Sequence, residues 1–272
     1  MKAIKNRLKI RSKNHSAKLL DRFECDKLSV LRLGSKTPND VVFANSKRYK
    51  KGEIPFEINT VEACINSSNK RLMKQCFNKL DVATALWCDL SEFIEGNAEF
   101  SYPIVVKGIY GYKNKDNYFI KSKEELDEWL KVDRKIENYI VEKFYTYSKE
   151  YRVHVAKVGD KYNAFYSLRK MLVNDIPDED RWFRNDANCV WILEENEQFD
   201  APVNWDSIKE QACKAIESVG LSIGCVDVKT QSRKGECGCI ILETNSAPSL
   251  SEITAEKYNE QLKLMLNVIG IS

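Results

Sequence analysis

The segments CVDVKT (residues 225–230) and IILETNSAPS (residues 240–249) decide how this sequence folds. Both begin as apolar, partly β-branched runs and a polar turn separates them, so they predict two adjacent strands. Glu243 and Asn245 are two residues apart and point to one face of their strand, which Asp227 can share from the neighbouring strand. Two carboxylates and an amide oxygen among apolar neighbours favour a hard cation, usually magnesium bridging to phosphates. A hairpin with carboxylates facing solvent is the alternative interpretation.

The rest of the chain alternates helix and strand patterns. Apolar periodicity predicts two helices over residues 60–80, separated by a cap at Ser68 or Asn69, and further helices over 205–219 and 254–269. Ser122 begins a capping box that opens another helix. Strands are predicted over residues 102–107, 118–120, 139–144, 150–158, 221–228 and 238–242. This interleaving indicates an α+β fold rather than a bundle or a sandwich.

Composition excludes several classes of protein. The 272 residues are 43% hydrophobic, which suffices for a globular core, and the net charge of +3 is too small to indicate a nucleic-acid-binding protein. The basic N-terminus leaves that partner open, but its alternation at Ile4, Leu8 and Ile10 favours a first strand. Nine cysteines, two histidines and no long apolar run argue against disulfides, a zinc site, a histidine-dependent hydrolase and a membrane span. We expect a cytoplasmic protein.

Five motifs, in order along the chain, resemble those of the ATP-grasp superfamily. The C-terminal strand pair with ILETNSAPS is similar to the magnesium-binding end of these enzymes, and residues 102–107 resemble the strand that carries a phosphate-binding lysine. Residues 141–144 resemble the hinge that lies against adenine. Glu150 stands where the family keeps a ribose-binding carboxylate, and Lys70 resembles the first phosphate-binding lysine.

The resemblance implies a three-lobed fold that clamps ATP. The implied lobes are residues 1–66, a central lobe over 67–138 and a C-terminal lobe over 139–272 that carries the hinge and the metal ligands. The implied nucleotide-binding residues are Lys70, Lys107, Glu142, Lys143, Phe144 and Glu150. Asp227, Glu243 and Asn245 are the implied ligands for two Mg²⁺ ions, with Mn²⁺ as an alternative metal.

Basic and amide residues lie between the hinge and the metal ligands. In ATP-grasp ligases related to ribosomal-protein glutamate ligases, and in similar phage-borne ligases, this region holds the γ-phosphate and the acyl group. The corresponding candidates here are Arg152, Lys170, Arg184 and Asn188. Arg152 and Arg184 would bind a substrate carboxylate in bidentate fashion. A charged surface loop is the alternative interpretation.

The resemblance therefore implies a ligase that joins a carboxylate to an amine through an acyl-phosphate, with release of ADP and phosphate. The substrates would be amino acids, peptides or protein termini, and a phage origin would place the reaction in a host cytoplasm. Two alternatives stay open: a kinase on the same scaffold, and a nucleotide-binding module without catalysis. One departure from the family is the glycine-poor loop over residues 108–116, in which Lys113 and Lys115 would compensate by charge.

Overall fold

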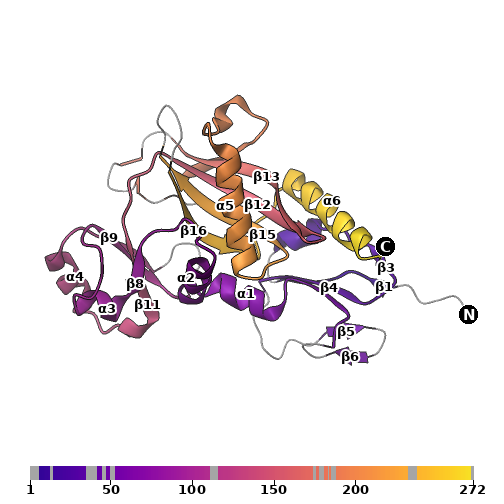
Figure 1. Cartoon of the computed structure of the whole chain (residues 1–272), viewed down its shortest axis with the longest axis horizontal. Coiled ribbons are helices and arrows are strands. Elements are labelled where there is room, and N and C mark those ends of the chain that lie inside the picture. Colours follow the sequence, from indigo (N-terminus) through magenta and orange to yellow (C-terminus); the bar gives the residue numbers. More distant parts are fainter. Residues whose placement is uncertain are drawn as a thin grey trace, which may run out of the picture.

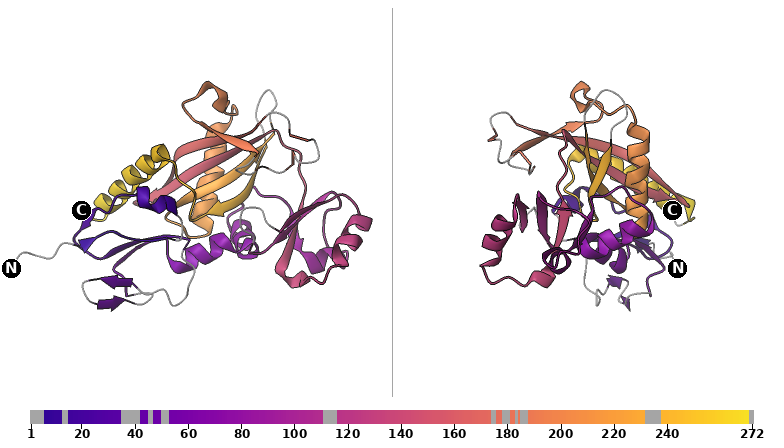
Figure 2. Two further views of the ribbon diagram at one scale, coloured as in Figure 1. Left: turned by 180° about the vertical axis from the view of Figure 1, so that it is seen from behind. Right: turned by 60° about the vertical axis from the view of Figure 1, so that its left-hand side comes forward.

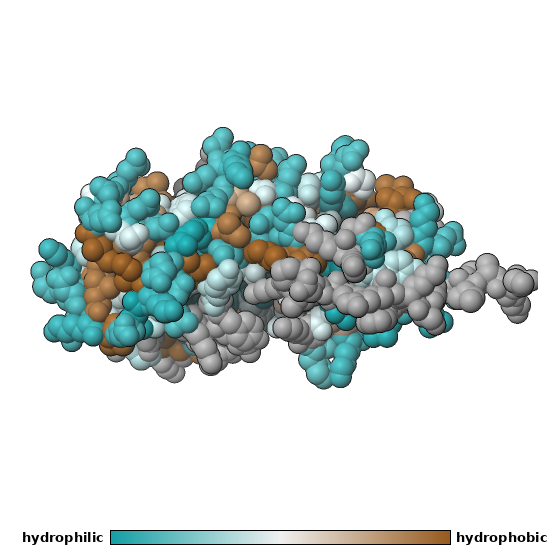
Figure 3. Space-filling model, turned by 90° about the horizontal axis from the view of Figure 1, so that it is seen from below, coloured by the Kyte–Doolittle hydropathy of each residue, from teal (hydrophilic) through white to brown (hydrophobic). Residues whose placement is uncertain are grey.

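The computed structural model describes residues 6–12, 15–34, 42–44, 47–49, 53–110, 116–173, 176–177, 181–182, 184, 188–231 and 238–270. Helices, antiparallel sheets and one parallel sheet form an α+β fold in this part of the chain, as the sequence predicts. The N-terminal and central lobes lie at opposite ends of the molecule, and the C-terminal lobe rises between them (Figure 1). Among the described residues on the face drawn in Figure 3, polar side chains are interspersed with apolar ones. None of the described helices is long and apolar enough to span a membrane.

The C-terminal lobe is built on a five-stranded antiparallel sheet in the order β14-β13-β12-β15-β16. Its strands are β12 (Lys149–Val158), β13 (Lys161–Leu172), β14 (Cys189–Leu193), β15 (Ile223–Thr230) and β16 (Cys239–Asn245). Helix α5 (Trp205–Ser218) packs Ile208 and Ala212 against Val153 and Val226 on one face. Helix α6 (Glu252–Val268) covers one end of the other face (Figures 1 and 2). Tyr258 of this helix contacts His154 of β12 there. The second face of the sheet is therefore left partly open toward the central lobe.

The central lobe has a four-stranded sheet in the order β10-β9-β11-β8. Its elements are β8 (Trp87–Asp89), α3 (Leu90–Ile94), β9 (Ile104–Gly108), β10 (Asn117–Ile120), α4 (Lys123–Leu130) and β11 (Tyr139–Lys143). The predicted hairpin of β9 with β10 and the predicted N-cap at Ser122 are confirmed, since the Ser122 hydroxyl accepts from the Glu125 amide. Strand β11, which begins at the predicted boundary of residue 139, pairs with β9 and β8 of this sheet.

The N-terminal lobe holds a parallel sheet of β2 (Lys9–Ser12), β4 (Ser29–Leu33) and β7 (Phe56–Ile58). Smaller pairs join β1 (Asn6–Arg7) to β3 (Glu24–Cys25) and β5 (Val42–Ala44) to β6 (Lys47–Tyr49). Helices α1 (Val61–Ser68) and α2 (Lys70–Lys79) follow, and Asn69 separates them as predicted, its side chain accepting from the Leu72 amide. Met73 and Phe77 of α2 enter the core shared with α5 and β15. Helix α2 thus packs with the C-terminal lobe.

A buried asparagine joins the N-terminal lobe to the large sheet. Asn59 follows β7 with a φ of 61° and a fully buried side chain. Its Oδ1 accepts from the amides of Ser222 (2.9 Å) and Ile223 (3.0 Å), and its Nδ2 donates to the carbonyls of Arg32 (3.0 Å) and Ile223 (2.8 Å). One side chain thus satisfies backbone groups from β4 and from the start of β15, and Asn tolerates the left-handed conformation.

We expect Asn59→Ala to lower the free energy of unfolding by about 3 kcal/mol or more, because it leaves buried backbone groups without partners and puts alanine at positive φ. Urea titration followed by circular dichroism measures this change. Asp81→Ala is the matched control, since Asp81 also has a positive φ (49°) but an exposed side chain; it should cost only about 1 kcal/mol. Equal decreases in the free energy of unfolding of the two variants would contradict the role of the Asn59 side chain in joining the N-terminal lobe to the large sheet.

Candidate active site

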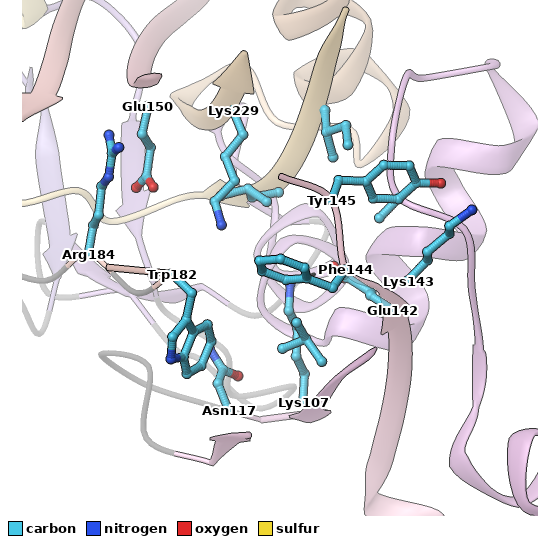
Figure 4. Close-up of a pocket in the computed structure, with 14 residues that line it drawn as sticks. Lys107, Asn117, Glu142, Lys143, Phe144, Tyr145, Glu150, Trp182, Arg184 and Lys229 are labelled. Atoms are coloured by element: carbon cyan, nitrogen blue, oxygen red, sulfur yellow. Dashed lines mark hydrogen bonds and ion pairs between the residues drawn. The ribbon is translucent and has the colours of Figure 1, made fainter. Parts of the chain in front are cut away.

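A pocket lies between the central sheet and the open face of the C-terminal sheet (Figure 4). Its volume is about 80 Å³, below the roughly 300 Å³ at which ligand pockets usually begin. The described residues that line the pocket are Ala85, Val105, Lys107, Asn117, Glu142, Lys143, Phe144, Tyr145, Glu150, Trp182, Arg184, Lys229, Ile240 and Leu242.

A buried carboxylate holds two lysines at the inner end of this pocket. Glu142 of β11 lies 2.7 Å from Nζ of Lys107 and 3.0 Å from Nζ of Lys74. Burial opposes ionisation of Glu142, but the two ammonium groups outweigh it and lower the pKa to about 2. Lys74 is fully buried and also donates to the Thr84 hydroxyl. Glu142, which the resemblance assigns to the adenine hinge, therefore orders Lys107, which the resemblance assigns to phosphate binding.

Lys74 was missed by sequence reasoning, although one signal was present. It lies four residues after Lys70 on α2, so both side chains share one face of that helix. Lys70 is itself buried at the N-terminus of α2, where backbone N–H groups favour an anion. The Lys70 amide donates to the Ile109 carbonyl (3.0 Å), and Asn69 Nδ2 donates to the Tyr110 hydroxyl (2.9 Å). These bonds fix the start of the loop after β9 against α2. The predicted compensating lysines of that loop, Lys113 and Lys115, lie outside the described residues.

The hinge contributes an aromatic wall. Phe144 contacts Phe119 of β10 at a centroid distance of 4.5 Å, and Phe119 stacks on Trp182 at 5.5 Å. Trp182 comes from the connection between β13 and β14, so the wall links both lobes. Lys143 is the last residue of β11, and its side chain points away from the pocket in Figure 4. Phe119 and Trp182 were not predicted as site residues, because isolated aromatics carry no spacing signal.

Ion pairs cross the open face of the large sheet. Arg152 lies opposite Asp227 on paired strands and binds it in bidentate fashion, with Nε–Oδ1 at 2.8 Å and Nη2–Oδ2 at 2.9 Å. Burial opposes ionisation of Asp227, but Arg152 outweighs it and lowers the pKa of the carboxyl. The guanidinium of Arg152 is therefore held by a protein carboxylate in this structure, whereas the sequence interpretation assigned it to a substrate carboxylate.

The three predicted metal ligands share this face. Asp227 lies opposite Glu243, and Asn245 lies opposite Cys225, with a bulge after Asp227. Asn245 Oδ1 accepts from the Ala247 amide (2.8 Å), while Glu243 is only partly buried. These oxygens are the donor type that magnesium prefers. Among the described residues no three His, Cys, Asp or Glu side chains form a metal-binding group, so phosphate oxygens and water would have to complete the coordination of an ion here.

Lys170 and Arg184 meet beside Glu150. Lys170 Nζ donates to the Arg184 carbonyl (2.7 Å) and lies 3.5 Å from Glu150 Oε1. Arg184 donates in return to the carbonyls of Lys170 and Ser148, both at 2.9 Å. Asn188 lies outside the pocket lining, where its Oδ1 accepts from the Cys189 thiol and its carbonyl accepts from the Val173 amide. Arg184 thus lines the pocket, Lys170 contacts the lining residues Arg184 and Glu150, and Asn188 lies just before β14.

Comparison with known proteins identifies the fold. No protein-family model and no curated protein matches the sequence. Carboxyaminoimidazole ribonucleotide synthase from Aspergillus clavatus, complexed with ATP, is similar with a TM-score of 0.61 and 15% identity, over 88% of this chain and 60% of its own. N5-carboxyaminoimidazole synthetase from Staphylococcus aureus, complexed with ADP, is similar with a TM-score of 0.57 and 16% identity, over 78% of this chain and 54% of its own. D-alanine–D-alanine ligase from Bacillus anthracis has a TM-score of 0.55 and 16% identity, over 79% of this chain and 71% of its own.

These solved structures have the ATP-grasp fold, and this chain has the same fold, as its motifs implied. The chain spans between 54% and 60% of the length of the carboxyaminoimidazole synthases that it matches. At this level of identity the likeness describes the arrangement of helices and strands. The roles of individual side chains in this chain therefore have to be argued from their own contacts.

We expect Glu142→Gln to lower the free energy of unfolding by about 3 kcal/mol at neutral pH, because the buried Lys74 and the partly buried Lys107 lose their counter-ion. The pKa of Glu142 falls from 4.5 to about 2 on folding, so its stabilising contribution is complete above pH 4.5 and is lost as the pH falls toward 2. Urea titrations between pH 7 and pH 3 should show wild type and variant converging in acid. Exposed Glu99→Gln is the control; a difference that stays constant with pH would contradict this role.

Proposed function

We propose that this protein is an ATP-dependent ligase that joins a carboxylate to an amine through an acyl-phosphate. The observation that carries the proposal is the pairing of a cation cluster with an oxygen-donor face. Lys107 and Lys74 meet at Glu142, and Glu243 acts electrostatically on both Lys74 and Arg152. Cations and hard oxygen donors at one site are what binding of a metal–triphosphate requires.

The proposed nucleotide position follows from the chemistry of the lining. A base fits the apolar walls formed by Val105, Phe144 and Leu242, and Glu150 can accept hydrogen bonds from ribose hydroxyls. Lys107 and Lys70 would neutralise the α- and β-phosphates. Asp227, Glu243 and Asn245 would hold Mg²⁺, which supplies charge neutralisation at the β- and γ-phosphates when bound. The structures of similar fold include complexes with ATP and with ADP.

The proposed reaction has two steps. A carboxylate oxygen of the first substrate forms a bond to the γ-phosphorus while the bond from that phosphorus to the bridging oxygen breaks, and ADP leaves. The nitrogen of the amine then attacks the acyl carbon, phosphate leaves, and the nitrogen loses a proton to solvent. Phosphoryl transfer depends mainly on positioning and charge stabilisation, which agrees with a pocket whose described lining contains no histidine. The substrates that we propose are amino acids, peptides or protein termini.

A kinase on the same scaffold is the second candidate, and one observation favours it. Arg152 is bound to Asp227 and Arg184 is bound to backbone carbonyls, so neither predicted carboxylate-binding arginine is held for a substrate acid. A hydroxyl acceptor needs no such arginine pair. The two candidates differ in their products, because a kinase leaves the phosphoryl group on the acceptor.

We expect ADP release from Mg²⁺-ATP only when a carboxylic acid and an amine are both supplied, with a product mass equal to their sum less water. The assay uses pooled amino acids, polyamines and small acids, with products identified by mass spectrometry. Glu243→Gln should reduce ADP release about 100-fold, the size of effect that follows loss of one charge-stabilising group. Glu256→Gln, an exposed change on α6, should leave it unaltered. A phosphorylated product would identify a kinase, and ATP binding without turnover would identify a binding module.

A further inference from the structure

Lys229 on β15 points its side chain into the pocket from the sheet face. In Figure 4 its Nζ lies in the space between the Glu150 carboxylate and the Phe144 ring. The ammonium stands 3.7 Å from the centroid of the Tyr147 ring. Among the described residues it makes no hydrogen bond or ion pair, so the aromatic ring is its one close partner there.

The other cations of the pocket lining are engaged differently. Lys107 is bound to Glu142, Arg184 donates to two carbonyls, and Lys143 points away from the pocket. A partly buried ammonium without a hydrogen-bond acceptor is costly. A ligand that offers an acceptor at this position would therefore gain more from Lys229 than from a cation that must first release a protein partner.

The position of Lys229 indicates which part of a nucleotide it meets. Its cross-strand neighbours are Glu150 on β12 and Ile240 on β16. Ile240, Leu242 and Phe144 form the apolar part of the lining, which suits a base, and Glu150 suits ribose hydroxyls. The Tyr147 ring also lies 5.0 Å from the Arg184 guanidinium, and its hydroxyl is within hydrogen-bonding distance of Glu150 Oε2 and the Trp182 carbonyl.

We propose that Lys229 is a further nucleotide-binding residue that donates a hydrogen bond to the nucleoside, at a ring nitrogen of the base or an oxygen of the ribose, and not to the phosphates. This inference rests on the proposed binding of ATP. It assigns Lys229 a part in nucleotide selection that is separate from the charge neutralisation by Lys107 and Lys70.

The test is isothermal titration calorimetry at one pH with ATP, adenosine and tripolyphosphate. Lys229→Met should raise the dissociation constants for ATP and for adenosine by the same factor, about tenfold for the loss of one charged hydrogen bond. The dissociation constant for tripolyphosphate should stay unchanged. Lys229→Gln should give the same pattern and serves where the methionine variant folds poorly. Lys157→Met is the matched control, because Lys157 also lies on the sheet over a tyrosine ring, at 5.5 Å from Tyr162, outside the pocket.

Three results would overturn the inference. Unchanged ATP binding by both Lys229 variants would show that the residue is structural only. Weaker binding of ATP and of tripolyphosphate, with unchanged binding of adenosine, would place the contact at the phosphates. Absence of ATP binding by the wild type would overturn the proposed function and this inference together. If the wild type catalyses ATP-dependent ligation and the Lys229 variants bind ATP as the wild type does, only the inference is overturned.

Discussion

The buried carboxylate of Glu142 is the constraint on which the site depends. It receives Lys107 from the central sheet and Lys74 from α2, a helix that packs with the C-terminal core. An ionised carboxylate in such a place is stable only with close counter-ions, so the ion cluster fixes how the two lobes meet. The orientation of Lys107 and one contact between the central sheet and α2 therefore depend on the same carboxylate.

From this cluster, charges of opposite sign continue along the sheet face. Glu243 lies near enough to act on Lys74 and on Arg152, and Arg152 is paired with Asp227. Alternation lets each charge stay out of water with a neighbour that compensates it. A bound divalent cation and its phosphates add positive and negative charge in the same alternating way. Under the proposed function, a metal–triphosphate on this face would leave no buried charge uncompensated.

Local signals predicted much of this arrangement, and non-local pairing explains what they missed. The caps at Asn69 and Ser122, the β9–β10 hairpin and the shared face of Asp227, Glu243 and Asn245 follow from turn chemistry and strand periodicity. Strand β13 was not predicted, since its mixed sequence becomes a strand through its partners β12 and β14. The pairing of β11 with β9 and the burial of Lys74 depend likewise on contacts distant in sequence.

A site for a polyanion has to hold its cations in place before the ligand arrives, and the strength of each holding contact decides which of them can change partner. Lys107 and Arg152 are bound to carboxylates, the strongest acceptors in a protein. Arg184 is bound to neutral carbonyls and Lys229 to an aromatic ring, which are weaker partners. Arg184 and Lys229 of the C-terminal lobe can therefore exchange their protein partners for a ligand most easily. The ion pairs of Glu142, which join the central sheet to α2, are the hardest to break.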